Sequence, residues 1–437
     1  MPSYRFMVTA IDAIGHINAV LGFSEALQAA GHEICFVHRE KHRHLAVKRG
    51  FQFIPFDETV WKANLDEIML KWLDSLSSRF KQDPLQRFLE ISPTEHEGYK
   101  AQGSFFVIMN EAIDRILSDK NNKFDALLVD LAAPFPALHK HPVLWFPLMS
   151  SAPLALYPSG PPYTSGYSVY SDKSKWEEYR KALREAHSEI IKIIQGNLDA
   201  YGLSHIRFDP TYWHDEPQTV GFYHYPAALD YTECGPRSKN WYGIDCLVRQ
   251  PDFDTDFVIP ENLKNKPGKL IYFSLGSLGS ADASLMQKFI DILSKSPHKF
   301  IISKGVRGDQ LKLGDNMWGE NYVDQIKVVQ NVDLVITHGG NNTFIETLYY
   351  GKPMIVIPYF YDQFDNAQRV VDKKIGFRVN LYDLDEDYLL NCIENVFNDN
   401  EIQNRVKAIS QNMRNSKSLS NAIKMMEKRI EQKNNSS

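Results

Sequence analysis

Two short apolar runs between residues 322 and 368 constrain the fold more than any other part of this sequence. Leu334–Thr337 and Met354–Pro358 are rich in β-branched residues, the pattern of strands buried in a parallel sheet. The first run is followed by His338–Thr343 (HGGNNT), where two glycines precede small polar residues and a tight turn can open a helix. After the second run, Asp362 begins another helix. The stretch therefore predicts an α/β fold with a parallel sheet.

A strand, a glycine turn and a helix N-terminus together form an anion site, because unpaired N–H groups and the positive end of the helix dipole face one small volume. Gly340 lets a ligand approach the backbone, and His338, Asn342 and Thr343 can add side-chain donors. Glu346 lies one helical turn, or ~5 Å, beyond Asn342. This offset suits a nucleotide, with phosphates on the turn and ribose hydroxyls on the carboxylate.

The dipeptide Asp362-Gln363 follows the second apolar run directly enough to lie at the carboxyl end of that strand. Ligands of open α/β sheets bind at this edge. A carboxylate and an amide in that place can hydrogen-bond the hydroxyls of a sugar. The two residues therefore predict a sugar next to the nucleotide.

The whole stretch resembles the signature of the UDP-glycosyltransferases, a family with the GT-B fold. That signature runs from an aromatic residue and a glutamine, through H-x-G-x-N-[ST]-x-x-E, to a terminal D-Q. Tyr322 stands where tryptophan is commonest but still offers a flat face to uracil, and Asn341 stands where tryptophan or alanine is frequent. The matching positions are Tyr322, Gln325, His338, Gly340, Asn342, Thr343, Glu346, Asp362 and Gln363.

The resemblance implies a role for each of these positions. It assigns UDP binding to the part of the signature from Tyr322 to Glu346, with Val323 included, and the donor sugar to Asp362 and Gln363. Ser277, in the turn after a strand predicted at Lys269–Phe273, is expected to join the helix amides that stabilise the departing diphosphate.

The resemblance also implies the GT-B architecture, in which two Rossmann-like domains face each other across a cleft. We place an acceptor-binding domain at residues 1–238 and a UDP-sugar-binding domain at residues 239–415. The segment Asp230–Gly243, punctuated by glycine and proline, is the expected crossing. The last helix, predicted at Leu419–Gln432 within residues 416–437, is expected to pack back on the first domain.

The first third of the chain repeats the alternation of strands and helices. Strands predicted at Tyr4–Ala10, Glu33–Val37 and Phe51–Pro55 indicate a parallel sheet with right-handed crossovers. No G-x-G-x-x-G follows the first of them, which weighs against a dinucleotide-dependent dehydrogenase. Further along, Trp176–Leu198 predicts one long helix.

His16 is the candidate catalytic base. It follows the first strand within a Gly-His pair that resembles the family's G-H motif, and a neutral imidazole suits proton abstraction. Asp130, which ends a strand predicted at Ala126–Val129, is the candidate partner that orients the imidazole. Without the resemblance, a helix cap or a packed polar residue explains His16 better than catalysis does, and a cap of the following turn is the alternative for Asp130. Asp12 and Asp125 are less suitable partners by their spacing.

The sequence predicts neither a metal nor a cofactor. The basic segment around His38, His42 and His44 carries no carboxylate or cysteine at ligand spacing, so a solvated helix face explains it better. No D-x-D motif is placed to hold a divalent ion between the domains. The GT-B relatives work without a metal, so the resemblance implies metal-independent transfer.

Composition excludes several classes of protein. With 437 residues and a net charge of −5, the chain has room for two or three domains and no overall attraction to nucleic acid or anionic membranes. No apolar run approaches the ~20 residues that span a bilayer, and the N-terminus is expected to be a first strand rather than a signal peptide. Four scattered cysteines suit a reducing compartment. We therefore expect a cytoplasmic enzyme.

The resulting hypothesis is an inverting UDP-glycosyltransferase that moves a hexose, with glucose from UDP-glucose favoured, to a hydroxyl of a small lipophilic, aromatic acceptor, as in xenobiotic conjugation. A monomer is expected. The loops at residues 60–99 and 149–170 lie outside the motifs, so the acceptor stays unidentified. Two alternatives stay open: a GT-B UDP-sugar epimerase or hydrolase, and a non-catalytic protein that binds UDP-sugar or a lipophile.

Overall fold

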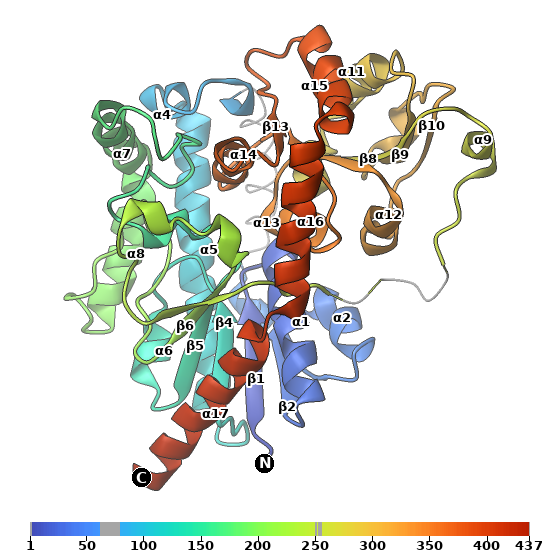
Figure 1. Cartoon of the computed structure of the whole chain (residues 1–437). Coiled ribbons are helices and arrows are strands. Elements are labelled where there is room, and N and C mark those ends of the chain that lie inside the picture. The colour runs from blue at the N-terminus through green and yellow to red at the C-terminus, as the bar shows by residue number, and fades with distance from the viewer. Residues whose placement is uncertain (1, 62–78, 250, 252–255, 437) are drawn as a thin grey trace.

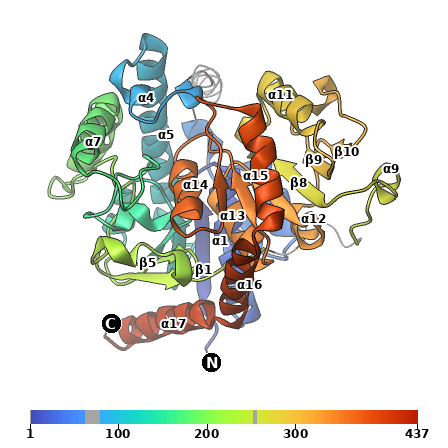
Figure 2. The same cartoon turned by 45° about the horizontal axis from the view of Figure 1, so that its top comes forward.

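The computed structural model consists of two α/β domains that face each other, the first coloured blue to green and the second yellow to red (Figure 1). It describes the chain except residues 1, 62–78, 250, 252–255 and 437. Each domain is built on a parallel sheet flanked by helices (Figure 2). The predicted GT-B arrangement of two Rossmann-like domains is therefore confirmed.

The first sheet has seven parallel strands in the order β3-β2-β1-β4-β5-β6-β7. Phe6 and Val8 of β1 belong to the apolar cluster that includes α1, whereas Met7 packs with α5 on the other face. Because both faces are covered, the strands are continuous apolar runs, which made most of them predictable. The strands are β1 Arg5–Ala10, β2 Glu33–His38, β3 Gln52–Pro55, β4 Ala126–Asp130, β5 Leu144–Met149, β6 Gly221–His224 and β7 Trp241–Ile244.

Helix α5 is a long helix of the first domain, with 26 residues. A capping box fixes its start, since Ser92 accepts from the N–H of Glu95 and the Glu95 carboxylate accepts from the N–H of Ser92. No helix among the described residues is both long enough and apolar enough to cross a bilayer. The helices of this domain are α1 Ile14–Ala29, α2 Arg43–Val47, α4 Gln86–Leu89, α5 Pro93–Ser118, α6 Pro136–Lys140, α7 Ser174–Ala186 and α8 Ser188–Ala200.

The prediction of one long helix at Trp176–Leu198 is wrong in one respect, because this segment forms two helices, α7 and α8, that meet at His187. This residue leaves helical geometry, with ψ of 15°, and its Nδ1 lies 2.8 Å from the carbonyl oxygen of Leu183. Its buried ring packs against Tyr99 and Trp213, so the bend places an imidazole inside the aromatic core. The polar sequence around the bend carries no glycine or proline that would have indicated it.

The second sheet has six parallel strands in the order β10-β9-β8-β11-β12-β13. The strands that carry the signature, β11 and β12, lie side by side with Thr337 opposite Val356. The strands are β8 Leu270–Ser274, β9 Lys299–Ser303, β10 Met317–Glu320, β11 Leu334–Thr337, β12 Met354–Val356 and β13 Gly376–Arg378. The helices are α9 Glu261–Lys264, α10 Gly276–Gly279, α11 Ala283–Leu293, α12 Gln325–Asn331, α13 Asn341–Tyr349, α14 Gln363–Asp372, α15 Glu386–Asn398 and α16 Asn400–Asn415.

The boundary between the domains lies later than predicted. Residue 238 falls between β6 and β7, and β7 pairs with β6 in the first sheet, so the chain leaves that sheet only after Ile244. The final helix, α17 at Ser418–Ser436, lies along the base of the first domain (Figure 1). There Ala422 and Met426 are buried with the core of the first domain.

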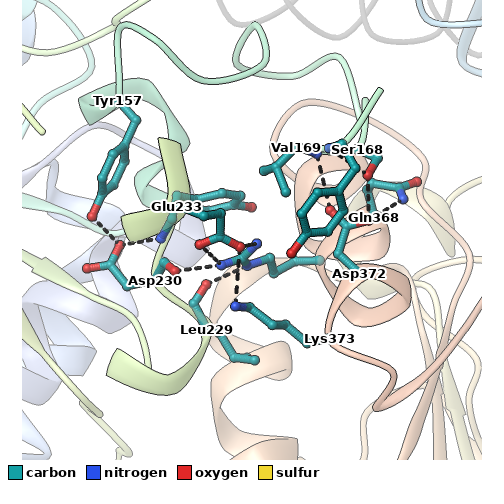
Figure 3. A network of polar contacts seen from close by, with 12 residues as sticks. Tyr157, Ser168, Val169, Leu229, Asp230, Glu233, Gln368, Asp372 and Lys373 are labelled. Carbon is teal, nitrogen blue, oxygen red and sulfur yellow. Dashed lines mark hydrogen bonds and ion pairs between the residues drawn. The ribbon is translucent and has the colours of Figure 1, made fainter. Parts of the chain in front are cut away.

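A buried arginine joins α14 to the first domain on one side of the cleft. The Arg369 side chain is fully buried and donates to the carbonyl oxygens of Leu229 and Asp230 and, in bidentate fashion, to the carboxylate of Glu233. Lys373 lies 3.2 Å from the same carboxylate (Figure 3). The interface therefore contains a buried guanidinium that donates four hydrogen bonds to oxygen acceptors of the first domain.

Replacing Arg369 with methionine should lower the free energy of unfolding by about 2–3 kcal/mol, because Glu233 and two carbonyl oxygens lose a charged partner. Urea unfolding of the whole chain measures this change. Arg429→Met, at an exposed position of α17, is the matched control and should leave the midpoint nearly unchanged. Equal midpoints for the two variants would contradict the role given to Arg369.

Candidate active site

A cavity of about 830 Å³ lies between the domains, at the carboxyl ends of both sheets. Its wall includes every site residue predicted from the sequence except Tyr322 and Val323. The predicted residues that line it are His16, Asp130, Ser277, Gln325, His338, Gly340, Asn342, Thr343, Glu346, Asp362 and Gln363.

His16 and Asp130 form a pair at one end of this cavity. His16 lies in the first turn of α1, and Asp130 ends β4, which is paired with β1 so that Asp130 lies opposite Ala10. The Nδ1 atom of His16 is 3.0 Å from Oδ1 of Asp130 and 3.0 Å from the hydroxyl of Ser150. The carboxylate side chain is 4% exposed and the imidazole 27%. The contact with Asp130 therefore orients the imidazole through Nδ1, and Nε2 is the ring nitrogen that can act on a ligand in the cavity.

The surroundings of His16 set its protonation. Burial by itself would lower the pKa of His16, but the adjacent Asp130 carboxylate, together with the charge of Asp362, raises the pKa above its ordinary value. The neutral form, which alone can accept a proton, therefore predominates only at a higher pH than for a free histidine. An acid limb in the pH–rate profile is the expected consequence.

The glycine turn after β11 is closely packed around His338. Gly339 has a φ of 83°, and a Cβ at Gly340 or Gly276 would come within 2.6 Å of the imidazole. Burial lowers the pKa of His338 to about 4, so its ring is neutral near pH 7. His338 therefore contributes shape and hydrogen bonding to the turn, and no positive charge.

Two asparagines at the start of α13 cross the cleft. Nδ2 of Asn342 donates to the carbonyl oxygen of Gly15, 2.8 Å away, in the residue before His16. Nδ2 of Asn341 donates to the carbonyl oxygens of Ser150 and His224. Side chains of the signature thus hydrogen-bond to the backbone of the first domain. Asn341, which stands where the family signature often has tryptophan or alanine, makes two of these contacts.

Glu346, one turn further along α13, is buried and already has partners. Its Oε2 accepts from Gln325 at 2.6 Å, and its Oε1 lies 3.2 Å from Nε of Arg249. Gln325 also donates to the hydroxyl of Thr343 at 3.0 Å. The carboxylate predicted to bind ribose is therefore held in place by an amide and a guanidinium, and Arg249 is a cavity residue that the sequence did not indicate.

Asp362 and Gln363 lie where α14 begins, after β12. Oδ2 of Asp362 accepts from the backbone N–H of Ala152 in the first domain at 2.9 Å, and burial raises the pKa of Asp362 to about 6. The side-chain oxygen Oε1 of Gln363 accepts from the backbone N–H groups of Tyr359 and Phe360, so the side-chain NH₂ is the group that can donate to a ligand. The preceding Tyr361 has a φ of 49°, a strained conformation typical of functional loops.

The first-domain end of the cavity is mainly apolar and aromatic. Its wall includes Phe105 and Phe106 of α5 and Trp213, which meets Tyr361 edge to face at 6.5 Å between ring centroids. Leu138 and Trp145 extend the same wall. The loop at residues 149–170 contributes Met149, Ser150, Ser151 and Tyr163 to the cavity wall, while residues 62–78 of the other loop lie outside the described chain.

Tyr322 and Val323 stand apart from the other predicted residues. The loop between β10 and α12 directs Val323 into the core of the second domain, where it packs with Val328 and Val329. Tyr322 is 58% exposed and does not line the cavity. Base stacking by Tyr322 stays a prediction.

A carboxylate lies close to the histidines of the basic segment, although their spacing in the sequence predicted no acidic ligand there. Possible ligand atoms of Asp12, His38 and His42 lie within 4.8 Å of one another, because β1 and β2 are neighbours. However, Asp12 already forms ion pairs with Arg39 at 3.0 Å and Lys41 at 2.7 Å. These two cations oppose the binding of a metal ion there.

Comparison with known proteins agrees with this geometry. Residues 284–430 match the glycosyltransferase family 28 C-terminal domain. The crystallised glycotransferase of kitacinnamycin superposes with a TM-score of 0.73 at 16% identity, over 98% of this chain and 100% of that one. VinC, a glycosyltransferase crystallised in complex with DTDP, gives 0.65 at 14% identity over 98% and 100%. The chain thus has a GT-B fold, and residues 284–430 are similar to the family 28 C-terminal domain.

Two curated relatives of this GT-B chain are glucosyltransferases by name. An uncharacterized UDP-glucosyltransferase, YdhE of Bacillus subtilis, is 28% identical over 44% of this chain and 50% of its own length. The sterol 3-beta-glucosyltransferase of Komagataella phaffii is 21% identical over 98% of this chain and 35% of its own. The chain thus spans half or less of the length of these relatives. The resemblance to the UDP-glycosyltransferases is confirmed.

Proposed function

We propose that this chain is an inverting UDP-glycosyltransferase that moves a hexose, with glucose from UDP-glucose as the donor, to a hydroxyl of a small lipophilic acceptor. One observation carries the proposal: the His16–Asp130 pair and the N-terminus of α13 open into one cavity from opposite domains. A base that faces an anion site across such a gap suits transfer from a diphosphate to a hydroxyl.

In this proposal the second domain holds the donor. Backbone amides at the start of α13, with Ser277 and Thr343, bind the diphosphate, and Glu346 accepts from the ribose hydroxyls. Asp362 and Gln363 contact the hydroxyls of the sugar, which places the anomeric carbon toward His16. The names of the curated relatives support glucose as that sugar.

The reaction is a single displacement. Nε2 of His16 removes the proton of the acceptor hydroxyl while its oxygen attacks the anomeric carbon, and Asp130 stabilises the imidazolium that forms. The bond between that carbon and the diphosphate breaks, and UDP leaves with the electron pair. Because the acceptor attacks from the face opposite UDP, the configuration at the anomeric carbon inverts.

The apolar end of the cavity supports a lipophilic acceptor. Three aromatic side chains line the same cavity as His16, namely Phe105, Trp213 and Tyr361. A flat, hydroxylated aromatic compound would bury its rings there and present its hydroxyl to the imidazole. Conjugation of xenobiotics is one setting for such chemistry.

We also propose a cytoplasmic location. Cys35, Cys234, Cys246 and Cys392 all carry free thiols, and burial raises the pKa of each to about 11. Such thiols are poor nucleophiles at neutral pH. This pattern suits a protein that folds and works under reducing conditions.

The proposed function is tested by incubating the purified chain with a panel of UDP-sugars and a library of phenolic acceptors, with EDTA present, and reading products by mass spectrometry. We expect a glycoside of inverted configuration from UDP-glucose, in spite of the EDTA. Altered or hydrolysed UDP-sugar without any need for acceptor would instead indicate an epimerase or hydrolase. Binding of UDP without any turnover would indicate a non-catalytic protein.

Glu346→Ala should raise the dissociation constant of uridine about tenfold or more, because a charged acceptor of the ribose hydroxyls is lost. Isothermal titration calorimetry measures this change. Glu394→Ala, on the exposed side of α15, is the control. An unchanged affinity for uridine in the Glu346 variant would remove the ribose role.

A further inference from the structure

Arg249 lies on the segment that leaves β7 and leads to the second domain, yet its side chain lines the cavity and is 13% exposed. Leu247, two residues earlier, is buried in the core of the first domain and anchors the segment. Nε of Arg249 is 3.2 Å from the carboxylate of Glu346. An interdomain connection thus places a permanent positive charge beside the proposed ribose site.

The donor half of the cavity is otherwise poor in positive charge. The diphosphate of a UDP-sugar carries about two negative charges at neutral pH, while Ser277, Asn342 and Thr343 are neutral donors and His338 is uncharged because its pKa is about 4. Among the described residues that line the cavity, arginine and lysine occur as Arg249 and Lys41. Lys41 belongs to the first domain and pairs with Asp12.

We propose that Arg249 binds the diphosphate of the donor and exchanges partners to do so. When the donor binds, the guanidinium moves from the Glu346 carboxylate to the diphosphate and donates hydrogen bonds to it. The Glu346 carboxylate then accepts hydrogen bonds from the ribose hydroxyls. Glu346 lies one turn along α13 from the amides that hold the phosphates, ~5 Å away, which a flexible arginine side chain can span. This inference rests on the proposed function and adds a residue from outside its signature.

The exchange would serve both binding and departure of UDP. A guanidinium can donate two parallel hydrogen bonds to phosphate oxygens, which are stronger than bonds from neutral groups. The charge of Arg249 would also stabilise the negative charge that grows on the diphosphate as the glycosidic bond breaks. Charge compensation of this kind is what a metal-independent site requires.

The test compares uridine, UMP and UDP by calorimetry on the wild type and on Arg249→Gln, with Arg249→Lys as the conservative variant. We expect Arg249→Gln to weaken UDP by about 10- to 100-fold and UMP by less, and to leave uridine as tight as before. Arg249→Lys should recover much of the affinity for UDP. Arg237→Gln, on the same crossing but bonded to the carbonyl oxygen of Trp241, should match the wild type.

Three results would overturn the inference. Equal weakening of uridine and UDP would mean that Arg249 acts only by holding Glu346 in place. Unchanged binding of UDP by Arg249→Gln would mean that the guanidinium does not reach the diphosphate. Failure of the wild type to bind any of the three ligands would overturn the proposed function and, with it, this inference.

Discussion

Replacement of His16 by alanine is expected to lower the rate of glycosyl transfer by about 10²- to 10⁴-fold while the dissociation constant of UDP stays near that of the wild type. The imidazole belongs to the first domain, whereas the residues proposed to hold the nucleotide line the cavity from the second domain. Loss of the base therefore removes proton abstraction without removing a contact to the donor.

Single-turnover kinetics and UDP calorimetry on the same preparation separate the two effects. His205→Ala is the matched control, because His205 is exposed in the first domain and does not line the cavity. Transfer at the wild-type rate by the His16 variant would exclude the base assignment. A parallel loss of UDP binding would show that His16 supports the donor site instead.

Asp130→Asn is expected to lower the plateau rate by about 10²-fold or more and to move the acid limb of the pH profile to lower pH. Burial lowers the pKa of His16, and the Asp130 carboxylate opposes this and raises it. When the carboxylate is removed, the pKa of His16 falls, so the neutral base predominates at a lower pH. The rate still drops, because nothing stabilises the imidazolium.

The measurement is kcat/KM against pH between about 5 and 9, which spans the ordinary pKa of histidine. Asp125→Asn is a matched control at the opposite end of β4, where the Asp125 carboxylate accepts from the N–H of Arg5 at 2.7 Å. It should leave the limb in place. An acid limb that stays fixed in the Asp130 variant would mean that another group sets it.

Elements with strong local patterns were predictable. The strand at Leu334–Thr337 has the predicted limits, because it is an apolar run buried on both faces. The strands β6 and β7 were missed, since Gly221–His224 and Trp241–Ile244 are short and mix glycine with aromatic residues. Their glycines have a packing reason, as a Cβ at Gly221 would come 2.8 Å from the ring of Trp241.

The candidate site was predictable where a motif, or the end of a predicted strand, marks the residue, as at Asp130 and Ser277. The signature indicated the residues from Gln325 to Gln363 that line the cavity. Arg249 is 97 residues from Glu346 in sequence, and no local pattern marks it. The aromatic wall at Phe105 and Trp213 likewise depends on how α5 and a distant loop meet, which periodicity does not reveal.

The hydrogen bonds and the ion pair of the buried Arg369 side chain also limit how the two domains can move relative to each other. Separating the domains there would expose a guanidinium and leave Glu233 and two backbone carbonyl oxygens without a charged partner, at a large energetic cost. Any opening of the cleft should therefore be a rotation of the second domain about α14, which stays in contact with the first domain. Asp362 and Gln363, at the start of α14, would then stay nearly fixed relative to the first domain, and the larger displacements would fall on the parts of the second domain that lie further from α14.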